Sequence, residues 1–117
     1  MAYARLRVDE RPQELVEVRV LCSWAEKLKG LLGTGRGAGA VMLTRCSSVH
    51  TFGMGYAIDL AFVGERGEVL KALLSVGPGR AASCEGASCV LERPTAAEPW
   101  LAEGEHLWVC GVSAEAL

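Results

Sequence analysis

The amino-acid sequence predicts a mostly β fold, a β-rich α+β domain in which about six strands form a compact, antiparallel or mixed, barrel-like sheet with one short helix. Short apolar segments with alternating or β-branched residues recur along the chain. Fourteen glycines in 117 residues indicate tight turns rather than long helices. This length is usual for one domain, so we expect residues 1–117 to form a single domain.

A strand followed directly by a helix is predicted near the start of the chain. Apolar and charged residues alternate over residues 15–21, which indicates a strand. Ser23 and Glu26 then have the spacing of a capping box, which predicts a helix that begins at Ser23 and ends at Gly33. Its apolar residues recur at helical spacing: Trp24, Leu28, Leu31 and Leu32.

Residues 35–39 are rich in glycine. They lack the Lys-Ser/Thr ending of a phosphate-binding loop, and no strand–helix–strand unit is evident around them, so we predict a plain connector. Residues 40–43 are apolar throughout and indicate a short buried strand.

A β-hairpin is the clearest pattern in the second half of the chain. Residues 57–63 and 68–76 form its strands, and the turn 64–67 joins them. A loop over residues 80–86 is expected to follow.

Two further strands are expected at residues 88–92 and 105–112. Between them, residues 95–101 predict one or two helical turns, because the first of them is a threonine and Glu98 stands three positions later.

Charge and hydropathy limit the classes of partner. Twelve basic and fourteen acidic residues give a net charge of −2, and the basic residues are scattered. Nucleic-acid binding usually needs a clustered basic surface, so we expect no nucleic-acid partner. The sequence has no apolar run of membrane-spanning length and no secretory signal, so we predict a cytoplasmic protein without a membrane partner. We expect no cofactor, and a monomer by default.

The sequence contains five cysteines: Cys22, Cys46, Cys84, Cys89 and Cys110. An odd number argues against a complete disulfide framework, so reduced thiols are expected. Cys110 follows a tryptophan and a valine, which predicts a small apolar side chain in the core.

Six short motifs occur in a characteristic order: Lys29-Gly30-Leu31-Leu32-Gly33, His50-Thr51-Phe52-Gly53-Met54, Ile58-Asp59-Leu60-Ala61-Phe62, Pro78-Gly79-Arg80, Val90-Leu91-Glu92-Arg93-Pro94 and Gly104-Glu105. Together they resemble the bacterial and archaeal domain of unknown function 192 (DUF192) over roughly residues 15–110. The chain departs from that pattern at Gly53, where the family often has a bulky aromatic residue, and at Gly55, where it often has a basic one. A third departure is at residues 95–97, where a glycine is common. The resemblance implies a fold and leaves the function open.

Cys46 and His50 suggest thiol chemistry, with Asp59 as the third member of a triad. The alternative is that His50 and Thr51 hydrogen-bond to backbone groups at the entry to a strand. Zinc is a second hypothesis, since Cys46, His50, Cys84 and Cys89 are a Cys₃His set of ligand types, but their spacings differ from those of usual zinc sites. The alternative there is that the cysteines are structural.

Asp59 interrupts an apolar strand and needs partners if it is buried. His50 and Arg80 are candidate partners, and a structural link between the His50 loop and the hairpin is favoured over a functional role. Arg80 itself could bind a carboxylate or a phosphate from a rigid turn, although a solvated arginine is the simpler interpretation.

Phe52, Met54 and Tyr56 alternate with glycines. On an extended segment the three side chains would share one side, either as core or as the floor of an apolar groove.

We therefore expect a non-enzymatic binding or accessory domain for a small molecule or a protein or peptide segment, with a shallow site near residues 50–54. A small hydrolytic or thiol enzyme that uses Cys46, and a zinc-stabilised structural module, are the alternatives. The expected ligand-binding residues are His50, Thr51, Met54, Asp59 and Arg80.

Overall fold

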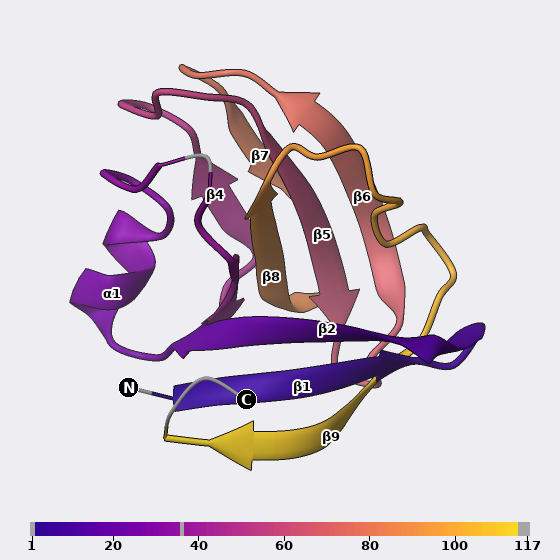
Figure 1. Ribbon diagram of the computed structural model, residues 1–117. Helices are drawn as coiled ribbons and strands as arrows, with labels where there is room; N and C mark the ends of the chain where they lie inside the picture. The colour runs from indigo at the N-terminus through magenta and orange to yellow at the C-terminus, as the bar shows by residue number, and fades with distance from the viewer. Residues whose placement is uncertain (1, 36, 115–117) are drawn as a thin grey trace.

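The computed structural model describes residues 2–35 and 37–114, which form nine strands and one helix (Figure 1). The elements follow one another as β1 (Ala2–Val8), β2 (Arg11–Leu21), α1 (Trp24–Lys29), β3 (Ala40–Thr44), β4 (Ser48–His50), β5 (Ile58–Gly64), β6 (Val69–Val76), β7 (Ala81–Ser83), β8 (Ala87–Pro94) and β9 (Leu107–Ser113).

The strands form two sheets. Seven of them make one sheet in the order β6-β5-β8-β3-β2-β1-β9, and β4 pairs with β7 in a small second sheet. The predicted hairpin is confirmed as the antiparallel pair β5 and β6. One pair, β2 and β3, is parallel, and α1 lies in its crossover. The expectation that no strand–helix–strand unit surrounds the glycine-rich loop is therefore wrong, because a six-residue helix is enough for this crossover.

The large sheet bends strongly, so that β1, β2 and β9 run crosswise to β5, β6 and β8 (Figure 1). Its two edges meet at one antiparallel bridge between Glu68 and His106. Next to this bridge the Leu107 N–H donates to the Gly67 carbonyl over 2.8 Å. Gly67 has φ +84°, and a Cβ there would stand 2.3 Å from the Leu107 oxygen, so only glycine fits. Despite this contact the sheet does not close into a barrel.

The mostly β fold with a mixed sheet and one short helix is thus confirmed, whereas the estimate of about six strands is too low. The three strands that the sequence did not reveal are β1, β4 and β7. Two of them have only three residues, which is too short for a recognisable alternation.

The predicted helix is present but shorter than expected. Its capping box is confirmed, since Ser23 Oγ accepts from the Glu26 N–H and the Glu26 carboxylate accepts from the Ser23 N–H. The helix ends at Gly30, whose φ is +50°, rather than at Gly33. Trp24 and Leu28 of this helix are 77% and 55% exposed, whereas Leu31, just after its end, is buried.

Residues 95–101 contain no helical turn, contrary to the sequence prediction. The Thr95 hydroxyl instead donates to Asp59 Oδ1 over 2.8 Å. The Thr95 N–H donates to the carbonyl of Ala57, which holds the segment against the start of β5.

Two clusters of buried apolar side chains fill the interior. One lies among β1, β2, β5, β8 and β9, and the other is built around Leu21, Leu31, Val41, Phe62 and Val90. The second cluster also receives Met54 and Tyr56 from the segment after β4. Leu31, just after α1, and the segment after β4 therefore contribute to the same part of the core.

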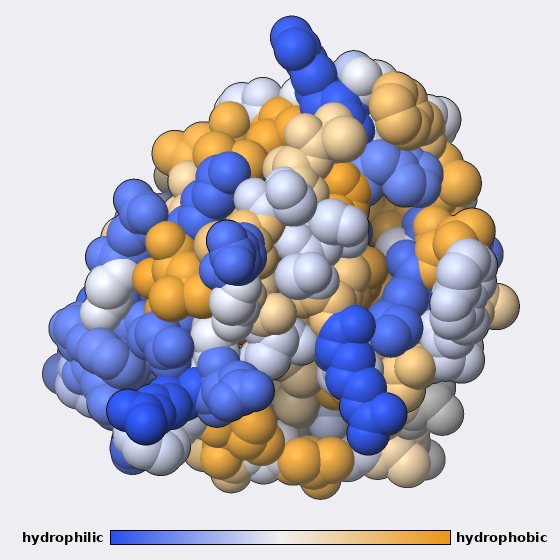
Figure 2. Space-filling view, turned by 180° about the vertical axis from the view of Figure 1, so that it is seen from behind, coloured by the Kyte–Doolittle hydropathy of each residue, from blue (hydrophilic) through white to orange (hydrophobic). Residues whose placement is uncertain are grey.

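The last strand exposes apolar side chains at one edge of the large sheet. Trp108, Val109 and Val112 are 52%, 60% and 71% exposed, and Figure 2 shows apolar side chains along the lower border of the molecule, where β9 lies. Cys110 on the same strand is exposed, so its predicted place in the core is wrong: it lies on an edge strand. No helix in the described residues is both long and apolar enough to span a membrane.

Candidate functional site

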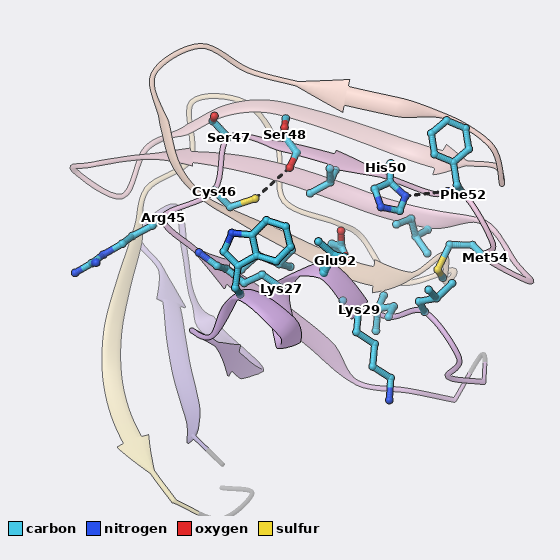
Figure 3. A pocket seen from close by; sticks show the side chains of 18 residues that line it. Lys27, Lys29, Arg45, Cys46, Ser47, Ser48, His50, Phe52, Met54 and Glu92 are labelled. Atoms are coloured by element: carbon cyan, nitrogen blue, oxygen red, sulfur yellow. Dashed lines mark hydrogen bonds between the residues drawn. The ribbon is translucent and has the colours of Figure 1, made fainter.

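A groove of about 450 Å³ separates α1 from β4 (Figure 3). One wall is α1 and the turn that follows it, residues 24–32. The other wall is the segment that contains β4, residues 45–54. The floor is part of the large sheet and comes from Leu43 on β3, Ile58 on β5 and Glu92 on β8. These segments are far apart in the sequence, so the groove exists only in the folded chain.

The helical wall approaches the sheet at two points. Lys27 Nζ donates to the carbonyl of Thr44, at the end of β3, over 2.9 Å. At the helix end, a Cβ on Gly30 would stand 3.0 Å from Glu92 Oε1. Glycine therefore permits both the positive φ and the close approach of the helix end to Glu92.

Glu92 is the acidic group at the bottom of the groove. Its side chain is only 4% exposed. Burial raises the pKa of Glu92 to about 7, against a smaller opposing effect of the hydrogen bond from the Leu31 backbone. The carboxyl group can therefore take up or release a proton near neutral pH.

In the sequence, Glu92 stands only as part of a family motif and was not among the predicted site residues. The signal that drew attention to Asp59, a carboxylate directly after apolar strand residues, is also present at Val90-Leu91-Glu92. Both carboxylates are buried in the structure. The same rule applied to both strands would have found both residues.

Cys46 and His50 both line the groove, but each uses a local backbone partner. Cys46 Sγ donates to the carbonyl of Ser48 over 3.1 Å. His50 Nδ1 accepts from the Phe52 N–H over 3.2 Å, and the two rings stack with centroids 5.4 Å apart. The expected hydrogen bonding of His50 to the backbone is thus confirmed.

Asp59 lies outside the groove and is held by a different set of partners. It is 1% exposed, and its carboxylate accepts from Arg93 Nε at 2.8 Å, from the Ser75 N–H at 2.9 Å and from Thr95 Oγ1 at 2.8 Å. The prediction that His50 or Arg80 pairs with Asp59 is therefore wrong. The three donors come from β8, β6 and the segment after β8, so Asp59 links these elements to β5 rather than orienting an imidazole.

Thr51 is buried and joins the end of β4 to the loop before β7. Its hydroxyl donates to the carbonyl of Gly77 at 2.7 Å and accepts from the Arg80 N–H at 2.8 Å. Its own N–H donates to the Arg80 carbonyl at 2.8 Å. The Thr51 side chain thus hydrogen-bonds to backbone groups, which is the alternative to a chemical role that the sequence offered. Arg80 takes part through its backbone, and its side chain is exposed.

We expect Thr51→Val to lower the free energy of unfolding by about 1–3 kcal/mol, because it removes the partner of the Gly77 carbonyl and of the Arg80 N–H in partly buried hydrogen bonds. Urea denaturation followed by circular dichroism measures this difference. Thr51→Ser keeps the hydroxyl and serves as the control, with a smaller expected loss. Equal stability of the valine variant and the wild type would contradict the structural role of this hydroxyl.

Phe52, Met54 and Tyr56 do not share one side. Met54 and Tyr56 are 9% and 8% exposed and pack in the core, while Phe52 is 57% exposed at the groove. The prediction of a common side is wrong because residues 51–57 form turns instead of an extended strand, with Gly53 at φ +82°. Met54 lines the groove from its inner side.

The cysteines are free thiols. Burial raises the pKa of the Cys89 thiol to about 11, with a smaller effect of nearby Cys46. Within residues 2–35 and 37–114, no group of three His, Cys, Asp or Glu side chains could hold a metal ion. The hypothetical zinc ligands Cys46, His50, Cys84 and Cys89 are all described and do not form such a group.

Of the five expected ligand-binding residues, the structure places His50 and Met54 at the groove. Thr51, Asp59 and the backbone of Arg80 lie in the hydrogen-bond networks described above. The groove residues that the sequence did not indicate come from α1 and from the floor: Trp24, Lys27, Leu28, Leu43 and Glu92.

No protein-family model matches the chain, and no curated protein matches it. Two solved structures share its fold. One is described as a "putative transcription regulator" from Sinorhizobium meliloti 1021, with 14% sequence identity, a TM-score of 0.73, and 92% of both chains covered. The other is a protein of unknown function from Novosphingobium aromaticivorans DSM 12444, with 16% identity and a TM-score of 0.69, covering 91% of this chain and 84% of that one.

Proposed function

We propose that this protein is a non-enzymatic binding domain that holds a small ligand or a peptide in the groove between α1 and β4. The observation that carries this proposal is the gathering of exposed apolar side chains at one hollow. Trp24, Leu28 and Phe52 all line the groove, although each is more than half exposed. Exposed apolar side chains around a concave surface are typical of binding sites.

The charges around the groove favour an anionic or polar ligand. Three cationic side chains line it, Lys27, Lys29 and Arg45, and Glu92 is the acidic residue among the described lining residues. Because the pKa of Glu92 is raised to about 7, this carboxyl carries less than a full negative charge at neutral pH. The groove therefore combines an apolar surface with net positive charge.

We also propose that the chain is a member of the DUF192 family. The motif residues that carry the resemblance support this proposal by their position: residues 29–32 lie on one wall of the groove, His50 and Phe52 on the other, and Ile58 and Glu92 on the floor. Five free thiols fit the proposed cytoplasmic location.

We expect 8-anilinonaphthalene-1-sulfonate, an apolar anion, to bind in the groove of the full chain. Titration should shift backbone amide signals of residues 27–32 and 46–54 in ¹⁵N-labelled protein, because this probe matches the apolar walls and the positive charge. Leu28→Glu should weaken binding at least tenfold, because it replaces apolar surface with a negative charge.

Leu74→Glu is the matched control. Leu74 is an exposed leucine on β6, 67% exposed, and it does not line the groove. Binding to this variant should equal binding to the wild type. Shifts confined to the exposed side chains of β9, with none at the groove, would refute the proposed site.

A further inference from the structure

The hydrogen bonds between β4 and β7 show which edge of β4 is occupied. The pairing is antiparallel, and the Cys84 N–H donates to the Ser47 carbonyl at 3.0 Å. Four residues later, the Thr51 N–H donates to the Arg80 carbonyl at 2.8 Å. In an antiparallel pair, residues that bond to the neighbour alternate with residues whose N–H and C=O point away from it. The odd-numbered residues of this segment therefore bond to β7.

The even-numbered residues, Ser48 and His50, consequently direct their backbone groups toward the opposite edge of β4. In the part of the chain that the structure describes, no other strand pairs with that edge. The Ser48 carbonyl accepts a hydrogen bond from the Cys46 thiol, which is a weak donor. A strand edge that is not paired with another strand offers its backbone N–H and C=O groups to another extended chain.

This open edge faces the groove. Residues 46–50 all line it, although successive side chains of a strand point to opposite faces. A surface that contacts every residue of a strand in turn must follow its edge. Figure 3 agrees: the dashed line from the Cys46 sulfur meets the Ser48 carbonyl on the side where Glu92 lies.

An added strand would find apolar partners on both sides. Below it lie the floor residues Leu43 and Ile58, and across the groove stand Leu28 and Leu32 of the helical wall. Alternate side chains of the added strand would therefore point into an apolar space. This arrangement provides affinity through backbone hydrogen bonds and selectivity through alternate side chains.

We infer that the groove binds a partner protein through an extended segment that adds to the free edge of β4, with apolar side chains toward the floor and acidic residues at its flanks. This inference rests on the proposed function and specifies the class of ligand that the groove binds. The acidic flanks complement Lys29 and Arg45, which are exposed at the groove. The partner thus forms the third strand of the small sheet, next to β4.

The test uses the full ¹⁵N-labelled chain and the peptide acetyl-Glu-Val-Ile-Val-Glu-amide. We expect shifts of the Ser48 and His50 amide signals and nuclear Overhauser effects from these amides to the peptide backbone. A peptide N-methylated at the amides that face β4 keeps its side chains but loses the donors, and should bind at least tenfold more weakly. Replacing both glutamates with lysines should also weaken binding, about threefold or more.

His50→Pro provides a matched test on the protein. Proline removes the outward N–H at a position on an edge strand, where it is tolerated, and His50→Ala removes the same side chain but keeps the N–H. We expect the proline variant to bind the peptide at least tenfold more weakly than the alanine variant. A dispersed amide spectrum of each variant verifies its fold, and the N-methylated peptide tests the inference without any substitution.

The outcomes separate this inference from the proposed function. Equal binding of the N-methylated and parent peptides, or peptide contacts at the β9 edge instead of β4, overturns strand addition. If the peptide leaves the groove signals unchanged while anilinonaphthalene sulfonate shifts them, the groove binds small ligands and the inference fails alone. If neither probe shifts the groove signals, the proposed function fails as well.

Discussion

Arg93→Met should lower the free energy of unfolding by about 3–5 kcal/mol, because it leaves a buried carboxylate without its cation. Asp59 is 1% exposed, and Arg93 Nε donates to it over 2.8 Å. The guanidinium also lies 4.6 Å from the centre of the Trp100 ring and donates to the carbonyls of Glu98 and Pro99. The substitution therefore also removes contacts that hold the segment after β8.

Urea denaturation at neutral pH measures this loss, and a surface pair provides the comparison. Arg7 and Asp9 form an ion pair at 3.8 Å with both side chains about half exposed, so Arg7→Met should cost less than about 1 kcal/mol. Asp59→Asn combined with Arg93→Met should cost less than the sum of the two single changes, since no unpaired charge remains. A loss below about 1 kcal/mol for Arg93→Met would contradict this account of Asp59.

Glu92→Gln should stabilise the protein increasingly as the pH rises from about 4.5 to about 7. Burial raises the folded-state pKa of Glu92 from its ordinary value of 4.5 to about 7. Between these values the unfolded chain releases the proton while the folded chain keeps it, so the wild type loses stability as the pH increases. Above about pH 7 the carboxyl is ionised in both states, and the difference stays constant.

The size of this effect follows from the shift, since one pKa unit corresponds to about 1.4 kcal/mol. The advantage of the glutamine variant over the wild type should grow by about 3 kcal/mol across the window. Urea midpoints of both proteins at several pH values from 4.5 to 8 measure it. A difference between the two proteins that does not vary with pH would show that the folded-state pKa of Glu92 is not raised above its ordinary value.

Glu105→Gln serves as the comparison of opposite sign. Burial of Glu105 acts to raise its pKa, but the hydrogen bonds from Arg11 and Ala102 outweigh it and lower the pKa below 4.5. Its contribution to stability is therefore complete above about pH 4.5 and is lost only as the pH falls further. From pH 5.5 to 8, the difference between this variant and the wild type should stay constant.

The parts of the fold that local patterns specify could be predicted from the sequence. The capping box at Ser23 and the β5–β6 hairpin depend on residues that are neighbours in the chain, and both are present. The same spacing at Thr95 led to a wrong helical prediction, because the competing partner Asp59 is 36 residues away. Local spacing does not show which of two hydrogen-bond partners a hydroxyl will take.

The candidate site was predictable only in part for a similar reason. His50 and Met54 lie on the segment that the sequence indicated, and both line the groove. The opposite wall comes from α1 and the acidic group from β8, and the parallel pairing of β2 with β3 brings the helix to that place. A parallel pair with a crossover of so few helical residues leaves no clear pattern in a single sequence.

The two walls of the groove differ in how firmly they are anchored. Thr51 fixes the end of β4 through hydrogen bonds of its hydroxyl, N–H and carbonyl to the loop before β7, whereas α1 contains no buried residue. A six-residue helix without buried side chains loses little burial free energy when it separates from the sheet, so its amide protons should exchange with solvent through local opening. Ordering this helix opposes ligand binding and so lowers the affinity of a ligand that requires it. The same freedom of the helix allows the groove to adapt to segments of different width.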